Sequence, residues 1–169
     1  SIAYLARFYS AHCRVVYGVT PDCVDYAKRT YGIDETKLSL LPLGADTDSI
    51  DFSQQAVVRR EVRETYGIPL SEQVIVTGGK LDAAKNVISL IEAMGALAFE
   101  GVTLVVFGSL GREIRLDFDR ALAASGCRVL YVGFLSRDQI NRLYLSSDLA
   151  FFPGTQSALW QQAIASGLP

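Results

Sequence analysis

The chain has 169 residues, about the length of one domain, and 50% of them are hydrophobic, so it can bury a sizeable core. No apolar run approaches the roughly 18 residues of a membrane-spanning helix, which argues against an integral membrane protein. A formal net charge of −2 argues against a broad basic surface for nucleic acid, but a few cations could still hold a small anionic ligand.

The chain begins with a short α/β pattern. Residues 14–19 look like a strand, and Thr20-Pro21 is typical of a helix N-cap followed by proline at the first helical position. This helix should run to about Thr30, and residues 37–41 predict a second short strand.

A turn-rich loop, PLGADTDSIDF at 42–52, comes next, followed by a charged helix expected from about Gln54 to Tyr66. Within the loop, Asp46 and Asp48 form a D-x-D pair that can hold a metal ion on a nucleotide-sugar diphosphate. Thr47, Asp48 and Ser49 are also good turn residues, however, and the turn is the favoured interpretation, so no metal site is predicted.

The rest of the chain alternates apolar strands with amphipathic helices. Short runs that are β-branched or aromatic, and apolar on both faces, are typical of parallel strands covered on both sides by helices. These runs lie at 74–78, 102–108, 127–134 and 148–154.

Three helical patterns separate these strands, with apolar residues three and four positions apart. The third opens with a capping box of Ser136 and Gln139. The apolar positions are Ile88, Ile91, Met94, Leu97 and Ala98, then Ile114, Phe118, Ala121 and Leu122, then Ile140, Leu143 and Tyr144. This order predicts an α/β fold with a Rossmann-like, doubly wound parallel sheet.

Ligands of such sheets collect at the carboxyl ends of the strands. There, TGGKLDAAKN places Gly78 and Gly79 before Lys80, with Lys85 at the start of the next helix. Two cations and free helix N–H groups could form a diphosphate grip, but from spacing alone a glycine turn with two solvated lysines is the favoured interpretation. FGSLGRE at 107–113 is interpreted as a simple turn beside Arg112. The Walker A pattern is absent. The G-x-G-x-x-G fingerprint is also absent, which argues against a nicotinamide dehydrogenase.

The cysteines and the single histidine point to no chemistry. Cys13, Cys23 and Cys127 are odd in number and lack metal-ligand spacing, so core thiols in a reducing compartment are expected. His12 is assigned no role. No charged and then apolar leader opens the chain, which favours a cytoplasmic location, and a first residue of Ser1 suggests part of a longer protein.

Four blocks resemble one family in the same order. TGGKLDAAKNVISLIEAM at 77–94 is similar to the "G-R-L, then K, then L-I-E-A" block of the retaining GT-B glycosyltransferases, of the large bacterial "glycosyl transferases group 1" (family 4) type. The other three blocks are LPLGADTDSIDF at 41–52, VGFLSRDQINRLYLSSDLAFFPG at 132–154 and AIASGLP at 163–169. Together they cover most of residues 37–169, which makes the resemblance far more specific than one block alone.

The resemblance implies the C-terminal, donor-binding half of a GT-B fold. Residues 1–36 would be an entry segment with the first strand and helix, and 37–169 a nucleotide-sugar-binding domain truncated at its C-terminal end, without the N-terminal acceptor domain. The implied enzyme is a hexosyltransferase that moves a sugar from a UDP-, GDP- or ADP-sugar to a glycan or lipid with retention, using no metal or cofactor. The fragment alone would be inactive, and the resemblance also allows peripheral membrane association of the full-length protein.

The resemblance further assigns the site residues. Lys80 and Lys85 would be catalytic, because cations stabilise the charge that grows on the departing diphosphate. Gly78 and Gly79 would shape the loop beside them. The main chain would contact the nucleobase at Gly133, Phe134 and Leu135, and the phosphates at Ser157, Ala158 and Leu159. Gly154, Gln156 and Gln162 complete the predicted donor-binding set.

Two of these positions depart from the family. Gln162 stands where the family carries a ribose-binding glutamate and Gly154 where it carries another, and no Asp or Glu occurs from 149 to 169. Gln162 can still bond ribose hydroxyls, but without charge, and Gln156 or Ser157 are candidate substitutes for the other acid. A non-catalytic GT-B partner domain with a degenerate donor site therefore stays open. So does a nucleotide-sugar epimerase, although such enzymes usually use acids and a histidine around the sugar.

Overall fold

The computed structural model describes residues 2–97, 100–155 and 157–169. It divides into two compact units, Ser1–Gly44 and Ala45–Pro169. The boundary expected between residues 36 and 37 lies inside the first unit, because strand β2 (Leu38–Leu40) pairs with strand β1 (Val16–Gly18) of that unit.

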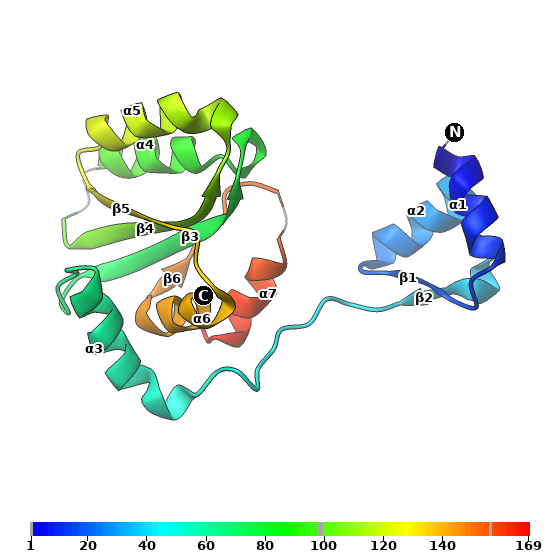
Figure 1. Ribbon diagram of the computed structural model, residues 1–169, viewed down its shortest axis with the longest axis horizontal. Helices are drawn as coiled ribbons and strands as arrows, with labels where there is room; N and C mark the ends of the chain where they lie inside the picture. The colour runs from blue at the N-terminus through cyan, green and yellow to red at the C-terminus, as the bar shows by residue number, and fades with distance from the viewer. Residues whose placement is uncertain (1, 98–99, 156) are drawn as a thin grey trace. The chain divides into compact units, whose positions relative to one another are not determined.

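The first unit is a small α/β segment, drawn in blue in Figure 1. Helix α1 (Ile2–Ala11), which the sequence analysis did not anticipate, precedes β1, helix α2 (Pro21–Tyr31), the 3-10 turn η1 (Glu35–Lys37) and β2. The predicted N-cap is confirmed, because the Thr20 side chain accepts a hydrogen bond from Cys23 N. Strands β1 and β2 are parallel, and both are shorter than predicted.

This unit buries very little. Among its described residues, only Gly18 and Ile33 are buried. Large apolar side chains are exposed instead: Ile2, Tyr4, Leu5, Phe8, Tyr9, Val15, Tyr17, Val19, Tyr26, Leu40, Leu41 and Leu43. The expectation of core thiols is therefore wrong for Cys13 and Cys23, which are exposed, and Cys127 is half-buried.

The second unit confirms the predicted α/β fold. Its sheet has four parallel strands in the order β5-β4-β3-β6. The strands are β3 (Gln73–Leu81), β4 (Val102–Leu110), β5 (Arg128–Gly133) and β6 (Leu149–Ala150). The helices are α3 (Gln55–Thr65), α4 (Val87–Leu97), α5 (Arg115–Ala124), α6 (Arg137–Ser146) and α7 (Ala158–Ala165), with 3-10 turns η2 (Phe52–Gln54), η3 (Ala83–Lys85) and η4 (Arg112–Ile114).

The sheet is covered on both faces, as its two-sided apolar strands predicted (Figure 1). Helices α4 and α5 pack on one face around Ile91, Leu104 and Phe118. On the other face, α3, α6 and α7 pack around a second cluster that includes Phe107 and Tyr144. The capping box at the start of α6 is present as predicted. Ala98, predicted to lie on the α4 face, falls outside the described residues.

Strands β3 and β6 differ most in length from the prediction. Strand β3 continues through the glycines to Leu81, because Gly79 (φ +124°) and Gly108 (φ +117°) lie side by side in the ladder. A Cβ on Gly108 would lie only 1.8 Å from the Gly79 carbonyl oxygen, so position 108 admits only glycine, and the positive φ of Gly79 favours glycine there too. The strand predicted at 148–154 is paired only at Leu149–Ala150, since Pro153 and Gly154 turn the chain away.

Candidate functional site

A crevice for a ligand is expected where the strand order reverses. The chain runs from β3 outward through β4 to β5, and then returns to place β6 on the other side of β3. The connections on either side of such a point cover opposite faces of the sheet, which leaves room at the carboxyl ends of the two strands. These ends carry the predicted loop at Gly78–Lys80 and the segment that enters α7.

The loop after β3, which includes η3, is hydrogen-bonded to the segment between β6 and α7. The Lys85 ammonium donates a hydrogen bond to Thr155 O at 2.8 Å, and Thr155 N donates to Ala84 O at 3.2 Å. The Asn86 side chain reaches Pro153 O at 3.4 Å. The turn η3, which presents Lys85, is therefore held against the segment that follows β6.

Gly154 is required by this contact. A Cβ at this position would lie 2.3 Å from Ala84 O and 2.5 Å from Lys85 Cα, both of them backbone atoms. The family resemblance places a glutamate at the position of Gly154. A glutamate could not fit here unless the backbone moved. The absence of a side chain is thus built into the packing of the two loops.

The predicted cations differ in their surroundings. Lys80 is exposed at the end of β3, opposite Ser109 of β4, and within the described part of the chain its ammonium group has no hydrogen bond or ion pair. Lys85 is half-buried and lines a small cavity of about 10 Å³ together with Gly78, Gly154 and Ser157. A cavity of this size holds about one water molecule, so a diphosphate would have to occupy the open side beside Lys80.

The start of α7 closes the same corner. Ser157 is its N-cap and accepts a hydrogen bond from Leu159 N at 3.3 Å. The Leu159 side chain would lie 3.2 Å from a Cβ on Gly79, which brings α7 directly against the glycine pair of β3. Ala158, the first helical residue, is exposed. Gln156 lies outside the described residues.

The predicted nucleobase segment follows β5 at the same edge of the sheet. Gly133 has a left-handed backbone (φ +74°), Phe134 is 81% exposed and Leu135 is buried. Strand β4 lies between β5 and β3, so this segment and the lysines are two strands apart along the same edge. Arg112, in η4 after β4, is also at this edge.

Gln162 is bonded to protein groups. Its side-chain oxygen accepts from Asp46 N at 3.2 Å, and its side-chain nitrogen donates to Asp46 O at 3.3 Å and to Asn141 Oδ1 at 2.9 Å. The Asp46 carboxylate forms an ion pair with Arg137 at 3.0 Å. The D-x-D loop thus meets α6 and α7 in the fold, an arrangement that the sequence analysis did not predict.

The comparisons with known proteins can be set against this geometry. The family model "Glycosyl transferases group 1" matches residues 58–159, more than half of the chain. The chain belongs to this family. The match includes β3, the lysine loop and the start of α7.

Two curated relatives of similar sequence are much longer. The chain is 28% identical over 131 residues to the D-inositol 3-phosphate glycosyltransferase of Xylanimonas cellulosilytica, covering 74% of this chain and 31% of that protein. It is 36% identical over 90 residues to glycogen synthase 1 of Methylococcus capsulatus, covering 52% of this chain and 17% of that protein. The chain therefore spans a third or less of the length of these two relatives.

Solved structures share the fold. WaaG, a glycosyltransferase involved in lipopolysaccharide biosynthesis, has a TM-score of 0.70 at 22% identity, over 90% of this chain and 42% of that one. Anabaena Alr3699/HepE, solved in complex with UDP and glucose, has a TM-score of 0.73 at 19% identity, over 99% of this chain and 47% of that one. At these identities the likeness establishes the Rossmann-like fold of GT-B glycosyltransferases, as predicted.

Sequence reasoning missed an ion network at the opposite end of the sheet. Asp148 pairs with Arg59 at 2.7 Å and with the fully buried Arg63 at 2.8 Å, and it accepts from Val74 N at 2.7 Å. Burial alone would raise the pKa of Asp148, but the hydrogen bonds from Val74 and Arg59 and the charges of Arg59 and Arg63 outweigh it and lower this pKa. Arg59 and Arg63 belong to α3, and Val74 and Asp148 stand at the amino ends of β3 and β6, so the network ties α3 to the end of the sheet opposite the candidate site.

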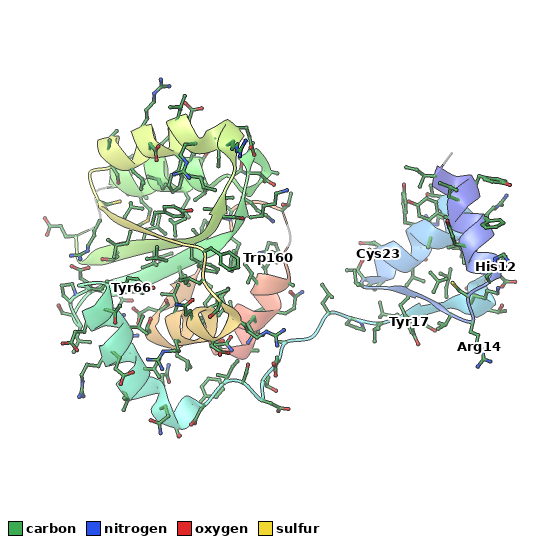
Figure 2. All side chains as sticks on the ribbon, viewed as in Figure 1. His12, Arg14, Tyr17, Cys23, Tyr66 and Trp160 are labelled. Atoms are coloured by element: carbon green, nitrogen blue, oxygen red, sulfur yellow. The ribbon has the colours of Figure 1, made fainter. Side chains whose placement is uncertain are left out.

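Neither His12 nor the potential metal ligands of the described residues form a further site. His12, at the end of α1 in the first unit (Figure 2), has its Nδ1 2.9 Å from Phe8 O. Across the described ranges, no group of three or more His, Cys, Asp or Glu side chains is arranged to hold a metal ion. No helix within the described residues is long and apolar enough to cross a bilayer.

Proposed function

We propose that residues 45–169 form the donor-binding domain of a glycosyltransferase, which transfers a hexose from a nucleotide-diphosphate sugar to a glycan or lipid acceptor with retention. The observation that carries this proposal is that η3 is hydrogen-bonded to the segment after β6 through Lys85 and Thr155. It places Lys85 beside the end of β3 and the start of α7, within a chain of the glycosyl transferases group 1 family.

The chemistry of these groups suits a departing diphosphate. Negative charge grows on the leaving group as the bond from sugar to phosphate breaks, and positioned cations stabilise that charge more in the transition state than in the ground state. Lys80 and Lys85 would supply the cations, and the N–H groups at the start of α7 would add further donors. In this proposal the enzyme needs neither metal nor cofactor.

The relatives support the choice of donor. Alr3699/HepE was solved with UDP and with UDP-glucose, and the curated relatives are named as a glycosyltransferase and a glycogen synthase. We extend to this chain a sugar nucleotide as donor and a cytoplasmic site of action. The acceptor would be bound by a second, N-terminal domain of the full-length protein.

Calorimetric titration of the full-length protein with UDP, GDP and ADP tests this proposal. One nucleotide should bind saturably, and Lys85→Ala should weaken it by about 10- to 100-fold, because a hydrogen bond to a charged group is worth about 1.5–3 kcal/mol. Lys85→Arg keeps the charge and should retain part of the affinity.

Lys28→Ala is the matched control, since Lys28 is also a half-exposed lysine but pairs with Glu35 in the first unit. The Lys28→Ala protein should bind the nucleotide with the same affinity as the unmodified protein. Saturable binding that Lys85→Ala leaves unchanged would contradict the assignment of Lys85. Transfer of a labelled sugar to an acceptor extract, followed by determination of the anomeric configuration, tests retention.

A second candidate function has one structural argument in its favour. Gly154 has no side chain, and the amide of Gln162 is bonded to Asp46 and Asn141, so neither position offers an acid to a sugar or a ribose. A non-catalytic partner domain that keeps the fold would have these features. Failure of the folded full-length protein to bind any of the three nucleotides would favour this candidate.

A further inference from the structure

A polar cluster joins three segments that are far apart in the sequence. It consists of Asp46 and Ser49 in the loop before η2, Asn141 and Arg137 of α6, and Gln162 of α7. Asn141 is 3% exposed, although the rest of the cluster is accessible to solvent. Neither the predicted diphosphate grip nor the apolar clusters include these contacts.

Gln162 uses both ends of its amide in this cluster. The side-chain oxygen accepts from Asp46 N, while the side-chain nitrogen donates to Asp46 O and to Asn141 Oδ1. Asn141 in turn donates to Ser49 Oγ at 2.9 Å, and Ser49 Oγ donates to Asp46 O at 3.0 Å. The backbone of one residue, Asp46, is thus held through both its N–H and its C=O group.

A carboxylate at position 162 could not make this pattern. It has no donor, so its second oxygen would face Asp46 O and Asn141 Oδ1, which are both acceptors. A flipped Asn141 amide could donate to that oxygen, but Asp46 O would still lose the donor from position 162. The side-chain carboxylate of Asp46 would also repel a negative charge at position 162. The cluster therefore selects glutamine over glutamate.

We infer that Gln162 is a positioning residue, an amide clamp that anchors the start of the second unit at Asp46. The chain between the units is otherwise unsupported: Leu41 N still bonds Gly18 O in the first unit, but no hydrogen bond involves residues 42–45 in the described structure. Asp46 is the first residue beyond them that the second unit holds. The clamp thus sets where the connection between the two units ends.

This role differs from that of a ribose ligand, and the two make opposite predictions for Gln162→Glu. In a clamp, Gln162→Glu keeps an acceptor for Asp46 N but loses the donor to Asp46 O and sets a carboxylate oxygen against Asp46 O and Asn141 Oδ1. This repulsion should pull the loop away from α7, so the Asp46 amide should exchange with deuterium about tenfold faster, the loss expected for a hydrogen bond worth about 1.4 kcal/mol. The affinity for UDP should not rise. A ribose ligand would instead gain a charge-assisted hydrogen bond, so UDP should bind more tightly while Asp46 exchange stays unchanged.

The experiment is hydrogen–deuterium exchange of the full-length protein, read at Asp46 by fragmentation mass spectrometry, together with a UDP titration. Gln162→Leu removes all three bonds of the amide, including the acceptor for Asp46 N, without adding charge. It should give an equal or larger loss of protection, which separates the lost amide from charge repulsion. Ser49→Ala removes one donor to Asp46 O and the acceptor for Asn141, but keeps the bond from Asp46 N to Gln162, so it should give a smaller loss.

Gln161→Glu is the matched control, because it adds the same charge one position earlier on α7, outside the cluster. It should leave Asp46 exchange unchanged. Unchanged protection of Asp46 in both Gln162 variants would overturn the inference. Equal acceleration in Gln161→Glu would overturn it too. Because exchange is measured without nucleotide, neither result depends on the proposed transferase function.

Discussion

The two units use the same kinds of element to very different effect. In the second unit, helices cover both faces of four parallel strands and bury two apolar clusters. In the first, two parallel strands lie with two helices, and only Gly18 and Ile33 are buried among the described residues. A parallel strand pair is stable only when enough apolar surface is covered, so the second unit should carry its own stability and the first should not.

The largest effect should come from Arg63 in the second unit. Arg63→Met leaves Asp148 without its buried partner and removes donors from Ser146 O, Pro69 O and Glu72 O, which should cost about 3–5 kcal/mol of unfolding free energy. Urea unfolding followed by the fluorescence of Trp160 reports this unit alone, because Trp160 is the single tryptophan and lies on α7 (Figure 2).

Arg120→Ala is the control for this measurement. Arg120 pairs with Asp117 while 77% exposed, so its loss should change the unfolding free energy by at most about 1 kcal/mol. A comparable cost for both arginines would show that the buried network is not what stabilises the second unit.

A pair of truncations compares the two units directly. Ile91 is 0% exposed in the second unit, and Ile91→Ala should cost about 2–5 kcal/mol through lost burial and a cavity. Tyr26, in the first unit, is 55% exposed, and Tyr26→Ala should leave the Trp160 unfolding transition in place. A shift in that transition on Tyr26→Ala would mean that the two units unfold together.

The smallest effect is a pH dependence that also separates the units. Because the pKa of Asp148 is lower in the folded chain than its ordinary 3.8, its contribution to stability is complete above about pH 4 and is lost as the pH falls further. The Trp160 transition should therefore weaken in acid, and Asp148→Asn should flatten this slope. Asp34, whose pKa is lowered by hydrogen bonds from Thr36, lies in the first unit, so Asp34→Asn should leave the slope unchanged.

Local patterns predicted the elements more successfully than their pairing. The spacing of Ile88, Ile91 and Met94 located α4, and Ser136 with Gln139 located the start of α6, because periodicity and capping involve neighbours in sequence. The predicted strand at 37–41 exists, but only the structure shows that it pairs with β1 and belongs to the first unit. The pattern gave no sign of α1.

The candidate site shows the same division. Its lysines and glycines were predicted from their place after a strand and from the family resemblance, and their roles stay predictions. The bond from Lys85 to Thr155 spans 70 residues, and those from Gln162 to Asp46 span 116. Contacts of such separation leave no trace in local spacing.

By itself, then, the sequence determined the fold class of residues 45–169 and the family, because apolar periodicity and short motifs record local geometry and burial. The tertiary structure alone decided the division after Gly44, the buried partners of Asp148 and the use of the Gln162 amide. Each of these depends on which distant backbone groups and charges meet, and that is settled by packing in three dimensions.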